Sequence, residues 1–86
     1  MTTVLLEHAP QNPEITEAGR NALQAWAAEL SRKLEDEGVD ARRAERLASL
    51  TISALEGALV QARVERSGRP LAIAAEELER LFVASR

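Results

Sequence analysis

The chain contains no cysteine and only one histidine, His8, among its 86 residues. Disulfide bonds and thiolate metal sites are therefore excluded, and one imidazole cannot build a metal cluster alone. We expect neither a metal nor a cofactor. A chain of this length buries only about 60–65% of the surface that its unfolded form exposes, so small folds usually need a disulfide, a metal or a partner chain. Because the first two are excluded, the sequence favours a partner chain.

Aromatic residues, membrane-spanning runs and catalytic motifs are also scarce. Aromatic side chains make up 2% of the chain, and no apolar stretch approaches the roughly 20 residues of a membrane span. The first residues lack the basic start of a signal peptide. We therefore expect a cytoplasmic protein without a membrane partner. We also expect no enzymatic activity, because neither a Ser-His-Asp arrangement nor a glycine-rich phosphate loop is present.

Two groups of arginine residues are candidates for a nucleic-acid surface. They are Arg42, Arg43 and Arg46, and Arg63, Arg66 and Arg69. Glu45 interrupts the first group and no aromatic residue is interleaved, whereas a nucleic-acid-binding helix carries more basic charge along one face. The net charge of −3 likewise lacks the basic excess of a phosphate-binding protein. We interpret both groups as solvated and expect no DNA binding by this chain alone.

The residues that are abundant favour helices. Hydrophobic residues make up 45% of the chain and are mainly Ala and Leu, which are strong helix formers, while the alternation typical of strands is absent. The expected fold class is all-α, in a single domain or a domain fragment. Asn12 and Asp40 suit helix starts, and Gly38 and Gly68 suit helix ends. These signals predict a helix end over 1–8 and helices over 13–37, 41–67 and 70–84.

The predicted helix over 41–67 has a wider apolar surface than one neighbouring helix requires. Its apolar side chains cover roughly 200° at 100° per residue, against about 100° for packing on one neighbour. Gly57 costs about 1 kcal/mol relative to Ala in a helix interior, which indicates a packing role. We therefore expect a homodimer built from this helix and the next one. The expected interface residues are Leu50, Ala54, Gly57, Ala58, Leu71, Leu78, Leu81 and Phe82.

Trp26 and Glu56 each leave two interpretations open. Trp26 either packs in the core of the first long helix or forms one wall of an apolar ligand pocket, since such pockets favour aromatic side chains. Glu56 interrupts an apolar stretch, and a buried unpaired carboxylate would cost several kcal/mol. It is either a rim carboxylate held by Arg63, two turns away, or a contact to a ligand or a partner helix.

The order of these segments resembles the C-terminal part of TetR-type transcriptional repressors. The run GVDARRAERLASLTISALEGALVQARVERSGRPLAIAAEELERLF, residues 38–82, resembles their last two helices, including the Glu-Gly-Ala step at 56–58. The segment LLEHAPQNPEI, residues 5–15, is similar to the end of an earlier helix and the start of the next. The segment ALQAWAAELSRKLEDEGV, residues 22–39, resembles the body of that next helix.

This resemblance implies antiparallel helices that dimerise as a four-helix bundle, with a small-molecule pocket among the helices before them. Family members also carry an N-terminal helix-turn-helix domain, which we expect this chain to lack. The first hypothesis is therefore the dimerisation and effector-binding portion of a repressor, which binds itself and a small apolar effector. The alternative is a free-standing helical interaction module that homodimerises or pairs with an intact repressor.

Overall fold

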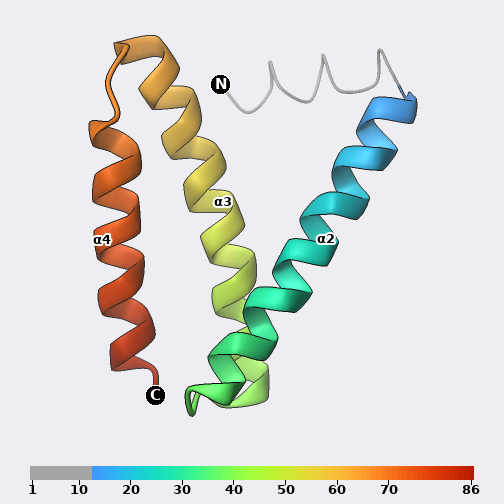
Figure 1. Cartoon of the computed structure of the whole chain (residues 1–86), viewed down its shortest axis with the longest axis vertical. Helices are drawn as coiled ribbons and strands as arrows, with labels where there is room; N and C mark the ends of the chain where they lie inside the picture. Colours follow the sequence, from blue (N-terminus) through green and yellow to red (C-terminus); the bar gives the residue numbers. More distant parts are fainter. Residues whose placement is uncertain (1–12) are drawn as a thin grey trace.

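The structure is a computed structural model that describes the backbone of residues 13–86 and the side chains from residue 17 onward. The predicted helix end over 1–8, with His8, lies outside the described residues. Within them the chain forms three helices and no strand, which confirms the all-α class. The helices are α2 (Pro13–Asp36), α3 (Ala41–Glu65) and α4 (Arg69–Ala84). In Figure 1, α3 and α4 run antiparallel, whereas α2 contacts one end of α3 and diverges from it.

The turn between α2 and α3 follows from local chemistry. Gly38 has a φ of +100°, a conformation that L side chains rarely adopt. The Val39 N–H donates to the Leu34 carbonyl at 3.0 Å, and the Gly38 N–H donates to Glu35, which together form a Schellman motif. Asp40 then caps α3 by accepting from the backbone N–H groups of two following residues, at 3.1 and 3.2 Å. Helix α2 therefore ends one residue before the predicted boundary.

The corner between α3 and α4 is built differently. Arg66 adopts the left-handed conformation, with φ 53° and ψ 47°, and its N–H donates to the Ala62 carbonyl. This conformation ends α3 at Glu65, two residues before the predicted boundary, although glycine usually occupies such a position. The Ser67 hydroxyl oxygen accepts the Arg69 N–H at 3.1 Å, so α4 begins at Arg69, one residue earlier than predicted.

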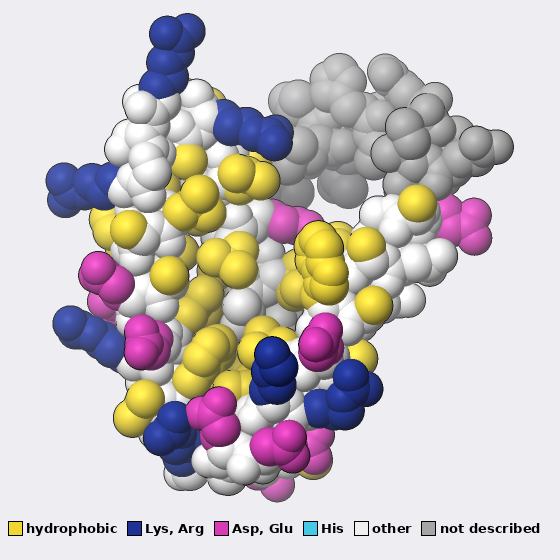
Figure 2. Space-filling view, in the orientation of Figure 1, with side chains coloured by type: hydrophobic (Ala, Val, Ile, Leu, Met, Phe, Trp, Pro, Cys, Tyr) yellow, Lys and Arg dark blue, Asp and Glu magenta, His cyan; other side chains and the backbone are white. Residues whose placement is uncertain are grey.

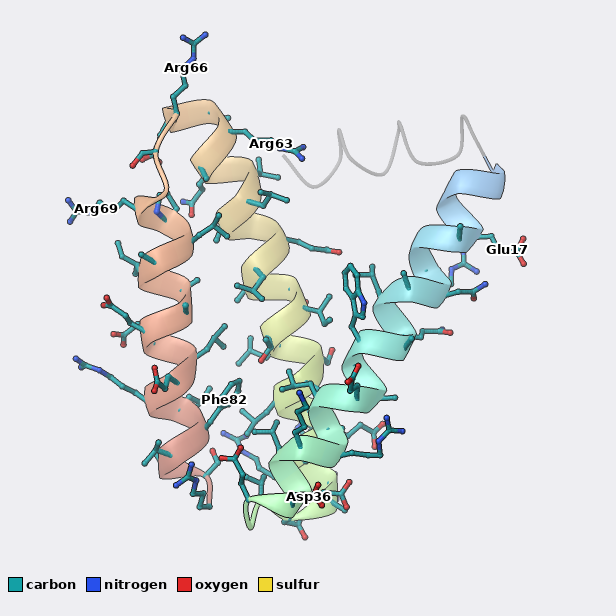
Figure 3. The ribbon with its side chains drawn as sticks, viewed as in Figure 1. Glu17, Asp36, Arg63, Arg66, Arg69 and Phe82 are labelled. Carbon is teal, nitrogen blue, oxygen red and sulfur yellow. The ribbon has the colours of Figure 1, made fainter. Side chains whose placement is uncertain are left out.

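Buried side chains concentrate where the α2–α3 turn meets the last turns of α4, a region that we call the closed end. The core cluster there consists of Leu34, Val39, Ala44 and Leu47, with Leu30, Leu81 and Phe82 packed against it. Figure 2 shows charged side chains gathered around this end and hydrophobic side chains extending from it between the helices. In Figure 3, Phe82 points from α4 toward the other two helices. The Arg86 guanidinium also donates to the Glu37 carboxylate at 2.7 Å.

The opposite end contains the α3–α4 corner and the diverging half of α2, and we call it the open end. Helix α3 contacts both other helices, yet its buried residues lie mainly in its first half. They are Ala44, Leu47, Ala48, Thr51 and Ala58. Two intrachain neighbours therefore account for part of the wide apolar surface that the sequence predicts for α3. The rest of that surface is exposed.

Candidate functional site

One solvent-facing side of α3 carries almost no charge. Between residues 47 and 62 the only charged residue is Glu56. Five residues at alternating spacings of three and four form a line on this side, which we call the α3 seam. They are Leu50, Ser53, Gly57, Val60 and Val64. At 100° per residue the seam lies about 140° from the buried side of the helix, and all of its residues except the half-buried Val60 are exposed.

Two apolar residues of the seam are well exposed. Leu50 is 48% exposed and Val64 is 72% exposed, although the outer side of a surface helix normally carries charged or polar residues. A Cβ atom built on Gly57 would meet nothing within 4 Å. Gly57 therefore makes no close contact inside the chain, and its low helix propensity gains nothing there.

The eight predicted interface residues divide into three groups. Leu50 and Gly57 lie on the exposed seam, and Ala54 and Leu71 are half-buried between helices of the same chain. The remaining four already pack inside the chain: Ala58 and Leu78 are buried, and Leu81 and Phe82 cover the core cluster. A helical wheel shows which residues share a side of the helix, but it does not show whether their neighbours belong to the same chain or to another one. Only the tertiary packing distinguishes the two.

Two exposed apolar residues, Val64 and Ile73, are absent from the predicted interface residues. Val64 completes the seam at one end. Ile73 is 47% exposed on α4 and lines a surface depression of about 290 Å³ with Gln61 of α3. No seam residue lines this depression, so Ile73 is a separate exposed apolar position on α4 near the open end. The sequence does contain a signal for Val64, because it lies seven residues after Gly57 and therefore on the same side of the helix.

A second apolar surface lies between the diverging helices. Trp26 of α2 is 60% exposed, and Leu55 and Leu59 of α3 are 38% and 41% exposed. Leu55 and Leu59 follow the buried Ala44 and Ala48 along the same side of α3. We call this surface the α2–α3 face. It extends the apolar core toward the open end, where α2 diverges from α3, and Figure 2 shows hydrophobic side chains between the helices there.

Trp26 therefore lies at the surface and outside the core cluster. Glu56 is also exposed. The ion pairs among the described residues join Arg80 with Glu77 and Arg86 with Glu37, so the expected Glu56–Arg63 pair does not form there. The Glu56 carboxylate thus remains available to a ligand or a partner.

A comparison with known protein families now bears on these surfaces. Residues 1–77 match a family model described as the C-terminal domain of LmrA/YxaF-like transcriptional regulators. The chain belongs to this TetR-type family. No curated protein and no solved structure matches the chain. The family consists of transcription regulators, and TetR C-terminal domains typically dimerise and bind effectors.

The family match covers both candidate surfaces. It includes all of α2 and α3 and the first half of α4, and therefore the α3 seam, Ile73 and Trp26. It ends at Glu77, before the α4 residues that pack against the closed end.

Other surface features of this TetR-type chain do not form an enclosed site. A depression of about 500 Å³ on the outer side of α4 is lined mainly by charged residues. No three His, Cys, Asp or Glu side chains in the described part of the chain are placed to hold a metal ion. Over the same residues, no helix has the length and hydrophobicity to cross a membrane.

Proposed function

We propose that this chain is the dimerisation and effector-binding portion of a TetR-type transcriptional repressor. The observation that carries the proposal is the α3 seam, an uncharged, partly apolar line on the solvent side of a helix. Exposed apolar surface of this kind marks an interface in soluble proteins. The partner is a second copy of the chain, as is typical of TetR C-terminal domains.

The α2–α3 face is the proposed effector surface. An exposed tryptophan with apolar neighbours suits a small apolar molecule, and a few polar groups usually orient such a ligand. Glu56, which directly follows Leu55 and makes no ion pair with Arg63, is the polar candidate. In this proposal Trp26 and Glu56 contact the effector, while the seam holds the dimer on another side of α3.

The chain is proposed to act without enzymatic activity and without binding DNA by itself. Specific DNA recognition needs side chains that reach base edges in a groove, and the described helices carry no continuous basic face. A second candidate role, pairing with an intact relative, is favoured by one observation. The proposed pairing surface lies entirely on α3 and α4, so a heterodimer needs no further element from this chain.

Sedimentation equilibrium tests the dimer, and fluorescence tests the effector surface. We expect a dimer at micromolar concentration, and a folded monomer there would contradict the proposal. Trp26 is the only tryptophan, so energy transfer to the apolar dye anilinonaphthalene sulfonate reports binding near it directly. Saturable transfer is expected, and Leu59→Lys should abolish it while Val83→Lys on α4 should not.

Gel retardation tests the expectation that the chain does not bind DNA by itself. With its own upstream DNA, the chain should form no sequence-selective complex.

A further inference from the structure

We infer that the effector of the α2–α3 face is a small amphipathic zwitterion, with its cationic group at Glu56, its apolar body on Leu59 and its anionic group at Arg63. The inference rests on the proposed effector surface and adds the chemical class of the ligand and its direction along α3. It is carried by the spacing of these three residues, by their exposure and by the lack of counter-charges in the described part of the chain.

A line of alternating apolar and charged residues borders the α2–α3 face. The line consists of Ile52, Glu56, Leu59 and Arg63, at spacings of four, three and four residues. At 100° per residue these positions fall within about 60° of one another, and we call the line the α3 flank. Ile52 is half-buried, whereas the other three residues are exposed. The flank therefore presents a carboxylate and a guanidinium on either side of an apolar side chain.

The flank lies on the side of α3 that faces α2. Gln61 lines a depression together with residues of α4 and so marks the α4 side of the helix. Leu59 lies about 160° around α3 from Gln61 at 100° per residue. In Figure 3, Arg63 points from α3 toward the side on which α2 diverges, whereas Glu17 of α2 projects away from α3. The two charges of the flank thus border the apolar α2–α3 face and not the α4 side.

The flank begins level with Trp26 and continues toward the open end. Trp26 lies ten residues before the last residue of α2, and Ile52 lies eleven residues after the first residue of α3. Both are therefore about 15 Å along their helices from the α2–α3 turn. Arg63 lies eleven residues beyond Ile52, or about 16 Å closer to the open end. A ligand along the flank thus has one end level with Trp26, whose fluorescence can report its binding.

Neither charge of the flank is neutralised by the described residues. No ion pair in that part of the chain includes Glu56 or Arg63. Seven residues separate the two, which is about 10.5 Å along the helix axis. A ligand with one charge would be attracted by one of these groups and repelled by the other, whereas a zwitterion of matching length satisfies both. A guanidinium pairs best with a planar oxyanion, so the anionic group is a carboxylate or a similar group.

Displacement of anilinonaphthalene sulfonate, with Trp26 as the energy donor, tests the ligand class. Three probes with the same apolar chain are compared: aminooctanoic acid with a terminal ammonium group, octylamine and octanoic acid. The variants are Glu56→Gln and Arg63→Gln. Glu76→Gln and Arg80→Gln, at exposed positions on the outer side of α4, are the matched controls. Because the dye is itself anionic, its affinity is measured for each variant before displacement.

We expect the zwitterion to displace the dye at about three- to tenfold lower concentration than either single-charge probe, because each partly exposed charge contact adds only modest affinity. Glu56→Gln and Arg63→Gln should each remove this advantage, and both controls should retain it. Glu56→Arg combined with Arg63→Glu should restore it, since the zwitterion can bind in the reverse direction. Equal displacement by the three probes would overturn the inference. Absence of dye transfer in the unmodified chain would instead overturn the proposed effector surface itself.

Discussion

The closed end and the open end of this three-helix domain are organised for different purposes. At the closed end a Schellman motif, an aspartate cap, a hydrophobic cluster and the contact between Arg86 and Glu37 hold all three helices together. At the open end α2 diverges, only Ala58 is buried in the second half of α3, and large apolar side chains face solvent. Contacts that stabilise the chain are therefore concentrated at one end, while apolar surface is left uncovered at the other.

Leu47→Ala should have the largest effect and would test the role of the closed end. Leu47 is 1% exposed in the core cluster, and truncating a buried leucine costs about 2–5 kcal/mol, partly through the cavity left behind. We expect a lower midpoint in urea unfolding, followed by circular dichroism, at every protein concentration. The control is Leu50→Ala on the seam, which should lower stability only through weaker dimerisation. Equal, concentration-independent losses in both variants would remove the distinction between the two sides of α3.

Gly57→Leu separates the fold from the dimer at the open end. Leucine has a higher helix propensity than glycine by roughly 0.8 kcal/mol, and nothing inside the chain opposes its side chain. The helix itself should become more stable, while overpacking at the seam should weaken the proposed dimer by about 1–3 kcal/mol. Sedimentation equilibrium measures the change. A dissociation constant that does not change would show that Gly57 faces solvent in the dimer as well.

Asp40→Ala should have an intermediate effect at the closed end. The Asp40 carboxylate accepts two backbone N–H groups at the start of α3, and loss of such a cap costs about 1 kcal/mol. Thermal unfolding of the variant should show a correspondingly lower midpoint. Asp40→Asn retains a capping oxygen and should restore most of the difference, whereas a carboxylate that acts only through its charge would not be rescued by asparagine.

Arg86→Ala should have the smallest effect. The guanidinium and the Glu37 carboxylate are both about half exposed, and exposed ion pairs contribute only about 0–1 kcal/mol because water and salt screen them. A double-mutant cycle with Glu37→Ala isolates the pair. A coupling energy well above this range would mean that α4 holds α2 mainly through this ion pair, and not through Leu81 and Phe82.

The sequence was most informative where structure depends on neighbouring residues. Gly38 and Asp40 predicted the α2–α3 turn because a left-handed residue and a capping carboxylate act over a few positions. The sequence predicts the end of α3 two residues too late, because Gly68 is a more favourable residue for a helix end than Arg66. The chain instead uses Arg66 in the left-handed conformation, a choice that local preference disfavours.

The candidate surfaces could be predicted from the sequence only in part. The wide apolar arc of α3 correctly indicated burial from more than one direction, because helical periodicity alone determines which residues share a side. It did not distinguish Ala58, which is buried in the chain, from its neighbour Gly57, which is open. Nor did it place Trp26 at the surface.

Helix positions and apolar surfaces were thus determined by the sequence, because capping, propensity and periodicity act along a single stretch of chain. Which apolar residues are covered was decided only by the tertiary structure. Leu47 is buried and Leu50, less than one turn away, is half exposed, because the α2 and α4 residues of the core cluster pack on the side of α3 that carries Leu47. Burial depends on where distant segments lie, and residue 47 receives neighbours from α2 and α4 that residue 50 does not.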